Sequence, residues 1–167
     1  MTLIAAVDKN WGLGLNGAPL FRIPADLRRF KALTMGHALL MGRKTFDSLP
    51  GPLPGRAHAV LSRDLPFSPP GVTVLRDLNE AREYALTRKT FLIGGEAVYA
   101  ALLDDCTLAH ITKIDAGREA DAYMPDLDAL PGWALTDEGP WREENGVRFR
   151  FCVYEPIPRS DNSPPAG

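Results

Sequence analysis

The chain has 167 residues, of which 45% are hydrophobic and 24% are charged, so length and composition predict one globular domain with a sizeable core. Its formal net charge is −2, which gives no chain-wide basic field for binding nucleic acid or an anionic membrane. The first apolar run, Leu3–Val7, is too short for a signal peptide or a spanning helix, so we expect a cytoplasmic protein. Cys106 and Cys152 form no CxxC motif, and we expect both to be buried, reduced thiols.

Short apolar runs bounded by glycine, proline or charged residues predict strands at Leu3–Val7, Ala38–Met41, Ala57–Leu61, Val72–Leu75, Thr90–Ile93 and Leu108–Ile114. Helices are expected between several of these strands. Pro24 suits the first position of a helix over Ala25–Leu33. Asp77 and Glu80 form a capping-box pattern before a second helix, and Glu96–Leu103 predicts a third. Alternation of strands and helices indicates an α/β domain with a mainly parallel sheet and right-handed crossovers.

The C-terminal part has a different pattern. Trp133–Thr136 and Val147–Tyr154 are strand-like with no helix between them, only a polar turn through Glu143–Gly146. This pattern predicts an antiparallel hairpin added to the sheet. The chain after Glu155 is rich in proline and serine, so we expect the domain to span residues 1–157 and a disordered tail to span 158–167.

Three glycine-bearing segments follow strands. The first, Trp11–Gly17, has no helix directly after it, so it does not fit the strand–turn–helix fingerprint of a Rossmann dinucleotide site. Two interpretations are open for it, a long flexible loop or a mobile lid over a site at the end of the strand.

The second and third segments, Met41–Thr45 and Ile93–Tyr99, both lead from a strand into a helix. Free N–H groups at a helix N-terminus and close approach at glycine suit a phosphate, and two such cradles suit a shared pyrophosphate. Glycines at such turns are also common for steric reasons alone. Basic and hydroxyl side chains nearby indicate an extra phosphate, hence NADP over NAD; these are Arg43, Lys44, Ser62 and Arg63.

On the helix that starts near Pro24, Asp26 and Phe30 are four residues apart and share a face. Asp26 is either a first-turn acid favoured by the helix dipole or a carboxylate that accepts two parallel N–H bonds from a flat heterocycle. His37, His58 and His110 are scattered without metal-ligand spacing, so we treat them as structural and expect no metal site.

The motifs IPADL, MGRKTF, LPGR and IGGEAVY, in this order and spacing, resemble those of bacterial dihydrofolate reductases. The resemblance continues through Thr112–Asp115 and Asp121–Pro125 and covers nearly the whole chain except the tail. It implies a single-domain fold with a central, mainly parallel, eight-stranded sheet, a C-terminal antiparallel hairpin and about four flanking helices.

The resemblance also implies roles for individual residues. Asp26 would bind the pterin ring with support from Thr112, and Phe30 would stack beside it. Arg56 would pair with the substrate's α-carboxylate, and Asp121 would contact the lid. The remaining substrate pocket would comprise Ile4, Ala5, Leu27, Leu49 and Leu53. The nicotinamide would be surrounded by Ala6, Leu13, Gly14, Ile93 and Tyr99. The rest of NADPH would be bound by Gly42, Arg43, Lys44, Thr45, Leu61, Ser62, Arg63, Gly94, Gly95, Glu96, Ala97 and Val98.

The lid departs from the common bacterial pattern, because Pro19-Leu20-Phe21 stands where the family often has Met, then Pro-Trp. Phe21, which we group with the catalytic residues, keeps an aromatic ring but lacks the indole N–H that can hold a water near the site. Pro19 limits the backbone freedom of the lid.

The implied activity is hydride transfer from NADPH to C6 of dihydrofolate with protonation at N5, which yields tetrahydrofolate for one-carbon metabolism. We expect antifolate inhibitors as further ligands, a monomer, and no nucleic-acid or membrane partner. Two alternatives are a pyrimidine reductase of riboflavin synthesis, which shares the fold and cofactor, and a non-catalytic nucleotide-binding module. A pyrimidine reductase would take a ribityl phosphate substrate, against which Asp26, Phe30 and Arg56 argue together.

Overall fold

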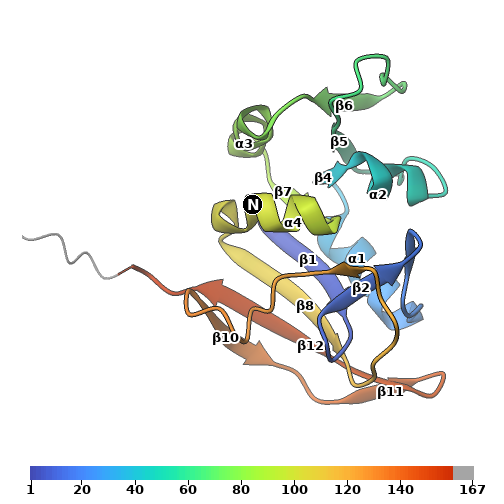
Figure 1. The fold of residues 1–167 in the computed structure, drawn as a ribbon, viewed down its shortest axis with the longest axis vertical. Helices are drawn as coiled ribbons and strands as arrows, with labels where there is room; N and C mark the ends of the chain where they lie inside the picture. The colour runs from blue at the N-terminus through green and yellow to red at the C-terminus, as the bar shows by residue number, and fades with distance from the viewer. Residues whose placement is uncertain (160–167) are drawn as a thin grey trace, which may run out of the picture.

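The computed structural model describes residues 1–159 and is built around one large twisted sheet (Figure 1). Eight strands form a continuous path in the order β10-β12-β8-β1-β7-β4-β5-β6. Their bounds are β1 (Thr2–Val7), β4 (Ala38–Gly42), β5 (Ala57–Leu61), β6 (Val72–Leu75), β7 (Thr90–Leu92), β8 (Leu108–Ile114), β10 (Trp133–Glu138) and β12 (Val147–Pro156).

Along this path the strands are parallel from β8 to β6, and they are antiparallel where β12 joins β8 and β10 joins β12. Its central strands are apolar along most of their length, and Leu3, Leu39, Leu40 and Leu92 are fully buried. Continuous apolar runs of this kind form strands that are covered on both faces, so the α/β fold class predicted from the sequence is confirmed.

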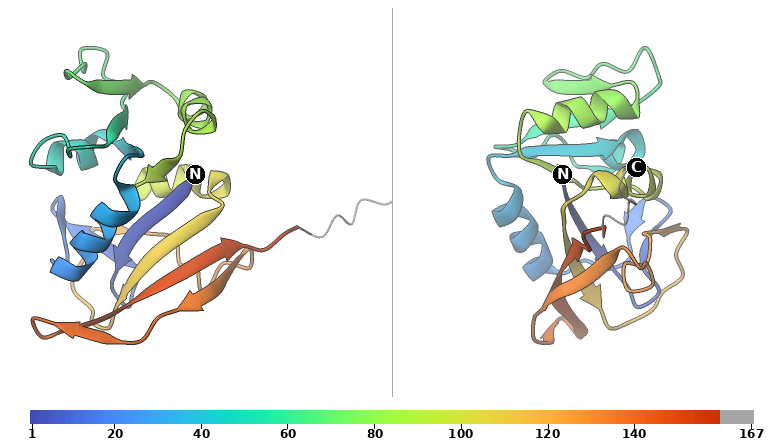
Figure 2. Two further views of the ribbon diagram at one scale, coloured as in Figure 1. Left: turned by 180° about the vertical axis from the view of Figure 1, so that it is seen from behind. Right: turned by 90° about the vertical axis from the view of Figure 1, so that its left-hand side faces the viewer.

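Within residues 1–159, four α-helices flank the sheet: α1 (Pro24–Thr34), α2 (Arg43–Ser48), α3 (Leu78–Leu86) and α4 (Glu96–Leu102). Helices α1 and α4 lie on opposite faces of β1, as the front and back views show (Figures 1 and 2). Helix α4 continues into a 3₁₀ turn, Leu103–Asp105. The predicted cap of α3 is present, because Asp77 accepts the Glu80 N–H at 2.8 Å. The Glu80 carboxylate binds the N–H of Arg76 instead of that of the cap residue.

The C-terminal hairpin is confirmed, but the expected polar turn through Glu143–Gly146 is wrong in part. Arg142–Glu144 forms a ninth strand, β11, which pairs with the start of β12. Only Asn145 and Gly146 form the turn, with φ angles of 54° and 76°. Asn-Gly suits a two-residue hairpin turn because both positions need positive φ, so the residues just before it remain free to pair as a strand.

The interpretation of Trp11–Gly17 as a long flexible loop is also wrong. Gly12–Leu15 is strand β2 of a second, three-stranded sheet, with β3 (Ala18–Pro19) on one side and β9 (Ala122–Tyr123) on the other. Glycine lowers strand propensity, and β9 comes more than a hundred residues later. The backbone pairing therefore had no local signal.

Cys106 and Cys152 are free and buried, as expected. No helix within residues 1–159 is long and apolar enough to cross a bilayer. Most of the predicted tail, residues 160–167, lies outside the described residues.

Candidate active site

The Asp26 side chain lies in the first turn of α1 and contacts the sheet. Thr112, in β8, donates its hydroxyl to Asp26 Oδ1 at 2.5 Å and is only 2% exposed. Thr112 pairs with Ala6 of β1 in the parallel register. Helix α1 and strand β8 thus hold the carboxylate at the sheet, and β8 is the neighbour of β1.

Burial raises the pKa of Asp26, while the Thr112 hydrogen bond and the positive charge of Arg29 oppose the rise. Arg29 lies one helical turn further along α1, and its guanidinium stands 4.4 Å from the ring centroid of Phe151. Its Nη2 is 3.4 Å from Nδ1 of His110, whose pKa is lowered by burial and by the Arg29 charge. Sequence analysis missed Arg29, although its spacing of three residues from Asp26 on one helix was a usable signal.

The predicted apolar lining of the substrate pocket is largely brought together. Ile4, Phe30, Leu49 and Leu53 belong to one hydrophobic cluster beneath α1 and α2. Ala5 belongs to the other face of the sheet, as strand alternation requires. Leu27 is 46% exposed at the rim of α1. The cluster therefore offers an apolar surface close to the Asp26 carboxylate.

The N-terminus of α1 is capped from a distant part of the chain. Ile23, at the N-cap position, makes no side-chain cap. Glu144 of β11 instead accepts the Ala25 N–H at 3.0 Å, and its second oxygen lies 3.5 Å from Arg28 Nη2. A carboxylate at a helix N-terminus satisfies a free donor and complements the dipole. No local pattern connects Glu144 with a helix that starts 120 residues earlier, so sequence analysis missed it.

Arg56 lies near the C-terminal end of the same helix. Its Nε donates to the Pro54 carbonyl at 3.1 Å, and its Nη1 donates to Thr34 Oγ1 at 3.3 Å. Burial lowers the pKa of Arg56 and that of His58, whose neutral Nε2 accepts the Leu53 N–H at 2.9 Å. The guanidinium is thus oriented along one edge, while its other N–H groups make no hydrogen bond within residues 1–159.

The two glycine segments that lead into helices meet, because their strands, β4 and β7, are neighbours. Gly42 donates its N–H to the Gly94 carbonyl at 2.9 Å. Gly94 has a φ of +131°, and a Cβ added at Gly94 or Gly95 would approach Thr45 Oγ1 to 3.4 or 3.3 Å. The φ of Gly94 favours glycine, and a side chain at Gly95 would crowd Thr45, so the cradle fits a ligand that approaches the backbone closely. Tyr99 ties α4 to β1 by donating to the Ile4 carbonyl at 2.7 Å.

A cavity of about 610 Å³ lies between the end of β5 and the start of α4. Of the predicted cofactor residues, Leu61, Ser62, Arg63, Ala97 and Val98 line it. Arg76 and Arg82 line it as well, and sequence analysis missed both. Arg82 is paired with Asp105 at 3.0 Å, and Arg76 donates to backbone carbonyls of the loop after β5. Among the described residues, Arg63 is therefore the lining cation that is left for an anionic ligand.

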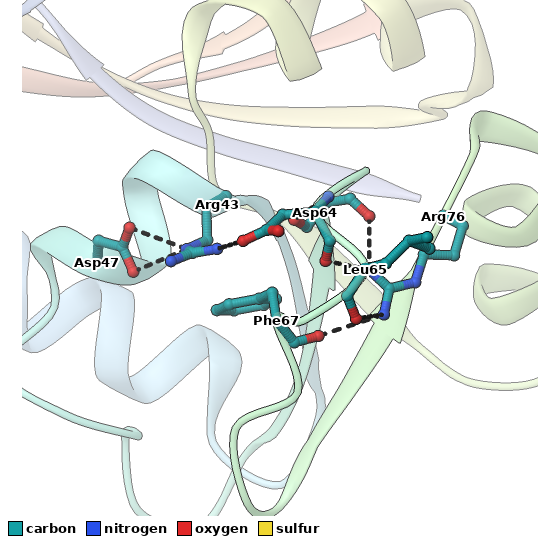
Figure 3. Close-up of polar contacts among 7 residues, drawn as sticks. Arg43, Asp47, Asp64, Leu65, Phe67 and Arg76 are labelled. Atoms are coloured by element: carbon teal, nitrogen blue, oxygen red, sulfur yellow. Dashed lines mark hydrogen bonds and ion pairs between the residues drawn. The ribbon is translucent and has the colours of Figure 1, made fainter.

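Arg43 is not among the residues that line this cavity, and its guanidinium is paired. Its Nε binds Asp47 at 3.0 Å, its Nη1 binds Asp64 at 3.1 Å, and the group stands 3.9 Å from the Phe67 ring centroid (Figure 3). The positive charge of Arg43, which was predicted to bind a phosphate, is therefore neutralised by two carboxylates. The sequence indicated a cation at this turn but not the acidic partner in the following loop.

Arg76 holds the loop after β5 in shape. Its guanidinium donates to the carbonyls of Ser62, Asp64, Leu65 and Phe67 at 2.6 to 3.3 Å (Figure 3). Because a planar guanidinium carries several fixed donors, it can bind several carbonyls at once. The loop that carries Arg63 is thereby fixed beside the cavity.

The remaining predicted residues are divided between the lid and the surface. Leu13 and Gly14 lie in β2, where the Gly14 carbonyl accepts the Asp121 N–H at 3.0 Å. Asp121 Oδ2 accepts the Asn16 N–H at 3.0 Å, which agrees with the predicted contact between this acid and the lid. Ala6 and Phe21 share one cluster, and Ile93 joins the cluster of Phe30. Glu96 binds the Tyr123 N–H at 3.3 Å, and Lys44 is exposed.

Two ligand surfaces therefore adjoin β1. One is a glycine cradle beside an arginine-lined cavity, and the other is a partly buried carboxylate above an apolar cluster. A cradle for a phosphate-bearing cofactor next to a pocket for a flat ring is typical of nicotinamide-dependent reductases with an α/β fold. The chain belongs to the dihydrofolate reductase family, whose model matches residues 1–156.

Individual relatives agree with this assignment. The dihydrofolate reductase of Mycobacterium tuberculosis is 41% identical over 159 residues, which cover 91% of this chain and 95% of that protein. The type 3 dihydrofolate reductase of Salmonella typhimurium is 38% identical over 156 residues, which cover 92% of this chain and 96% of that protein. A solved Enterococcus faecalis dihydrofolate reductase, complexed with NADP(H) and RAB-propyl, superposes with a TM-score of 0.85 at 27% identity, covering 93% of this chain and 95% of that one.

Proposed function

We propose that the chain catalyses reduction of 7,8-dihydrofolate to 5,6,7,8-tetrahydrofolate with NADPH, with hydride arriving at pterin C6 and a proton at N5. The observation that carries the proposal is the Asp26 carboxylate, bonded to Thr112 and set beside the apolar cluster of Phe30. Two carboxylate oxygens can accept two parallel N–H bonds from an aminopyrimidine ring. The product serves one-carbon metabolism.

The cradle and the arginine-lined cavity fit NADPH, because Gly94 and Gly95 leave the backbone open and Arg63 adds a cation. When bound, NADPH supplies the hydride. Gly42, Thr45, Gly94 and Gly95 would hold its pyrophosphate, and Ser62 and Arg63 its 2′-phosphate. Ala6 and Tyr99 would lie beside the nicotinamide. The Tyr99 hydroxyl also ties α4 to β1 through its hydrogen bond to the Ile4 carbonyl.

Asp26 orients the substrate and favours its protonated form. Thr112 fixes one carboxylate oxygen, so the group does not rotate away from the ring. A negative charge beside the pterin stabilises the positive charge that N5 gains on protonation. We propose that a water delivers this proton.

A spectrophotometric assay tests the function directly. We expect NADPH absorbance to fall on addition of dihydrofolate, with competitive inhibition by antifolates. No change at enzyme concentrations well above catalytic levels would refute the proposal. Turnover of a ribityl-phosphate pyrimidine instead would identify the alternative reductase. We further propose that the enzyme acts as a cytoplasmic monomer, which light scattering and fractionation of the host cell would check.

Cofactor preference should depend on Arg63. Because Arg43 is paired with Asp47 and Asp64, Arg63 is the predicted basic residue that lines the cavity without such a partner within residues 1–159. One charge-assisted hydrogen bond contributes about 1.5–3 kcal/mol, so Arg63→Ala should reduce the preference for NADPH over NADH by about tenfold or more. Ratios of kcat/KM for the two cofactors measure this, with Lys89→Ala, an exposed residue before β7, as the control. An unchanged ratio would show that the 2′-phosphate binds elsewhere.

Arg76→Lys should weaken binding of both cofactors alike, because a lysine ammonium cannot reach the four carbonyls that hold the loop. We expect Kd for NADPH and for NADH to rise by roughly three- to tenfold, as for the loss of about one net hydrogen bond or slightly more. Fluorescence titration would measure both constants. A change confined to NADPH would mean that Arg76 binds the 2′-phosphate directly.

A further inference from the structure

The lid comprises Gly12–Phe21, which is the glycine segment and the residues that lead toward α1. Backbone N–H groups tie it to acids at two points. The N–H of its first residue binds Asp8 Oδ1 at 2.8 Å, and Asn16 binds Asp121 at 3.0 Å. Neither tether reaches the end of the lid, where the chain turns into α1. A third attachment occurs there, and it involves Arg118.

Arg118 makes contacts to the last two lid residues through its side chain. Its Nη1 donates to the Leu20 carbonyl, and its guanidinium stands 3.9 Å from the Phe21 ring centroid. Its own N–H donates to Asp8 Oδ2 at 3.1 Å. Asp8 is 2% exposed, so Arg118 is anchored to a buried residue that also holds the start of the lid. A cation over an aromatic ring and a charged donor on a carbonyl are both attractive contacts.

The position of Phe21 affects the helix that carries Asp26. Phe21 packs against the buried cluster of Ile23, Ile114 and Phe149, which also includes Ala6 of β1. Ile23 is the N-cap residue of α1, and Asp26 lies in the first turn. Phe21 therefore contacts both Arg118 and the residues that border the site, and a shift of its ring would reach the site.

The Arg118 contact can open without disrupting the core. Arg118 is an exposed residue and, with Leu15, Pro19 and Leu20, it lines a cavity of about 410 Å³ beside the lid. Breaking the contact would expose the guanidinium to water and would leave no buried void. A contact of this kind suits a segment that must close and reopen in each cycle.

We propose that Arg118 is a positioning residue for hydride transfer: it holds the end of the lid, and with it the Phe21 ring, in the arrangement that the structure shows. The inference rests on the proposed function, because hydride transfer is the step that it serves. Arg118 touches no reacting atom and acts through Phe21.

The test compares Arg118→Met, which keeps an apolar stem, with Arg118→Lys, which keeps the charge. Arg148→Met is the matched control, because Arg148 also stands over an aromatic ring, Trp141, at 4.5 Å but on the C-terminal hairpin. In Arg118→Met we expect the single-turnover hydride-transfer rate to fall about three- to tenfold, with Kd for NADPH within about twofold. Lysine should restore part of the rate, since it can bind the Leu20 carbonyl but does not stack flat on Phe21.

A second set of measurements separates positioning from mere stability. In a Phe21→Leu background, Arg118→Met should cost clearly less than in the native chain, because the ring contact is already absent. Hydrogen exchange at the Leu20 amide, which bonds to the Leu13 carbonyl at 3.4 Å, should accelerate in Arg118→Met and stay unchanged in Arg148→Met.

An unchanged hydride-transfer rate, equal losses with and without the Phe21 ring, or unchanged Leu20 exchange would each overturn the role of Arg118. Failure of the proposed function has a different result, because the native chain would then not oxidise NADPH with dihydrofolate. The exchange measurement needs no substrate, so it tests the lid attachment in either case.

Discussion

Replacing Asp26 with Asn should reduce kcat/KM for dihydrofolate at neutral pH by a factor on the order of 10² to 10⁴, the range typical of lost acid–base assistance. Asn keeps the size of the side chain and one oxygen that can accept the Thr112 hydroxyl, so the local geometry should survive. It removes the negative charge that favours a protonated pterin. Steady-state kinetics across the pH range would measure the loss.

The loss should shrink as pH falls, because acidic solution itself helps to protonate dihydrofolate. NADPH binding should change little, since the glycine cradle is separate from the Asp26 carboxylate. Asp104→Asn, at an exposed helix end, is the matched control. A loss of less than about threefold at neutral pH, or an equal loss at every pH, would leave Asp26 as only a first-turn acid favoured by the helix dipole.

The same substitution has an opposite effect on stability. Burial raises the pKa of Asp26 above its ordinary value of 3.8, so the folded state binds this proton more tightly than the unfolded state. The free energy of unfolding therefore falls as pH rises from the ordinary pKa through the folded-state pKa, because the ionised form is disfavoured in the folded state. We expect Asp26→Asn to raise Tm at neutral pH, and the gain should disappear in acid below the ordinary pKa. Thermal unfolding at both extremes of pH would check the sign.

The sheet could be predicted because its strands carry their own signals. Leu39–Met41 and Leu3–Val7 are apolar without interruption, and such runs suit strands covered on both faces. The capping pattern at Asp77 located α3 for a similar reason, since donor and acceptor lie three residues apart. Strand β2 could not be predicted, because its glycines have low strand propensity and its partner β9 is distant in sequence.

The same contrast applies to the site. Asp26 and Phe30 could be paired from helical spacing alone, whereas the role of Thr112 rested on the family resemblance. Arg43 was predicted as a free cation, and its pairing with Asp64 depends on how the loop after β5 folds back. Glu144 caps α1 from a hairpin at the other end of the chain. Side chains that act across such separations leave no periodic pattern, so only the fold reveals them.

Arg56→Lys should raise KM for dihydrofolate roughly 10- to 100-fold, because about 1.5–3 kcal/mol of charge-assisted hydrogen bonding is lost. The structure orients the guanidinium by Nε on Pro54 and Nη1 on Thr34, which leaves the end of the fork for a carboxylate. A lysine ammonium cannot copy that bidentate geometry. Because the contact lies away from the reacting ring, kcat should stay within about threefold.

A dihydropterin that lacks the glutamate tail is the internal control, and its kcat/KM should change by less than about twofold, because it has no carboxylate to lose. Thr34→Val keeps Arg56 but removes one orienting partner, so it should raise KM for dihydrofolate by less than Arg56→Lys does. An equal loss on both substrates would contradict the substrate role. Arg56 would then support the C-terminal end of α1 through Thr34, whose hydroxyl binds the Phe30 carbonyl at 2.7 Å, and Phe30 would be displaced for every ligand.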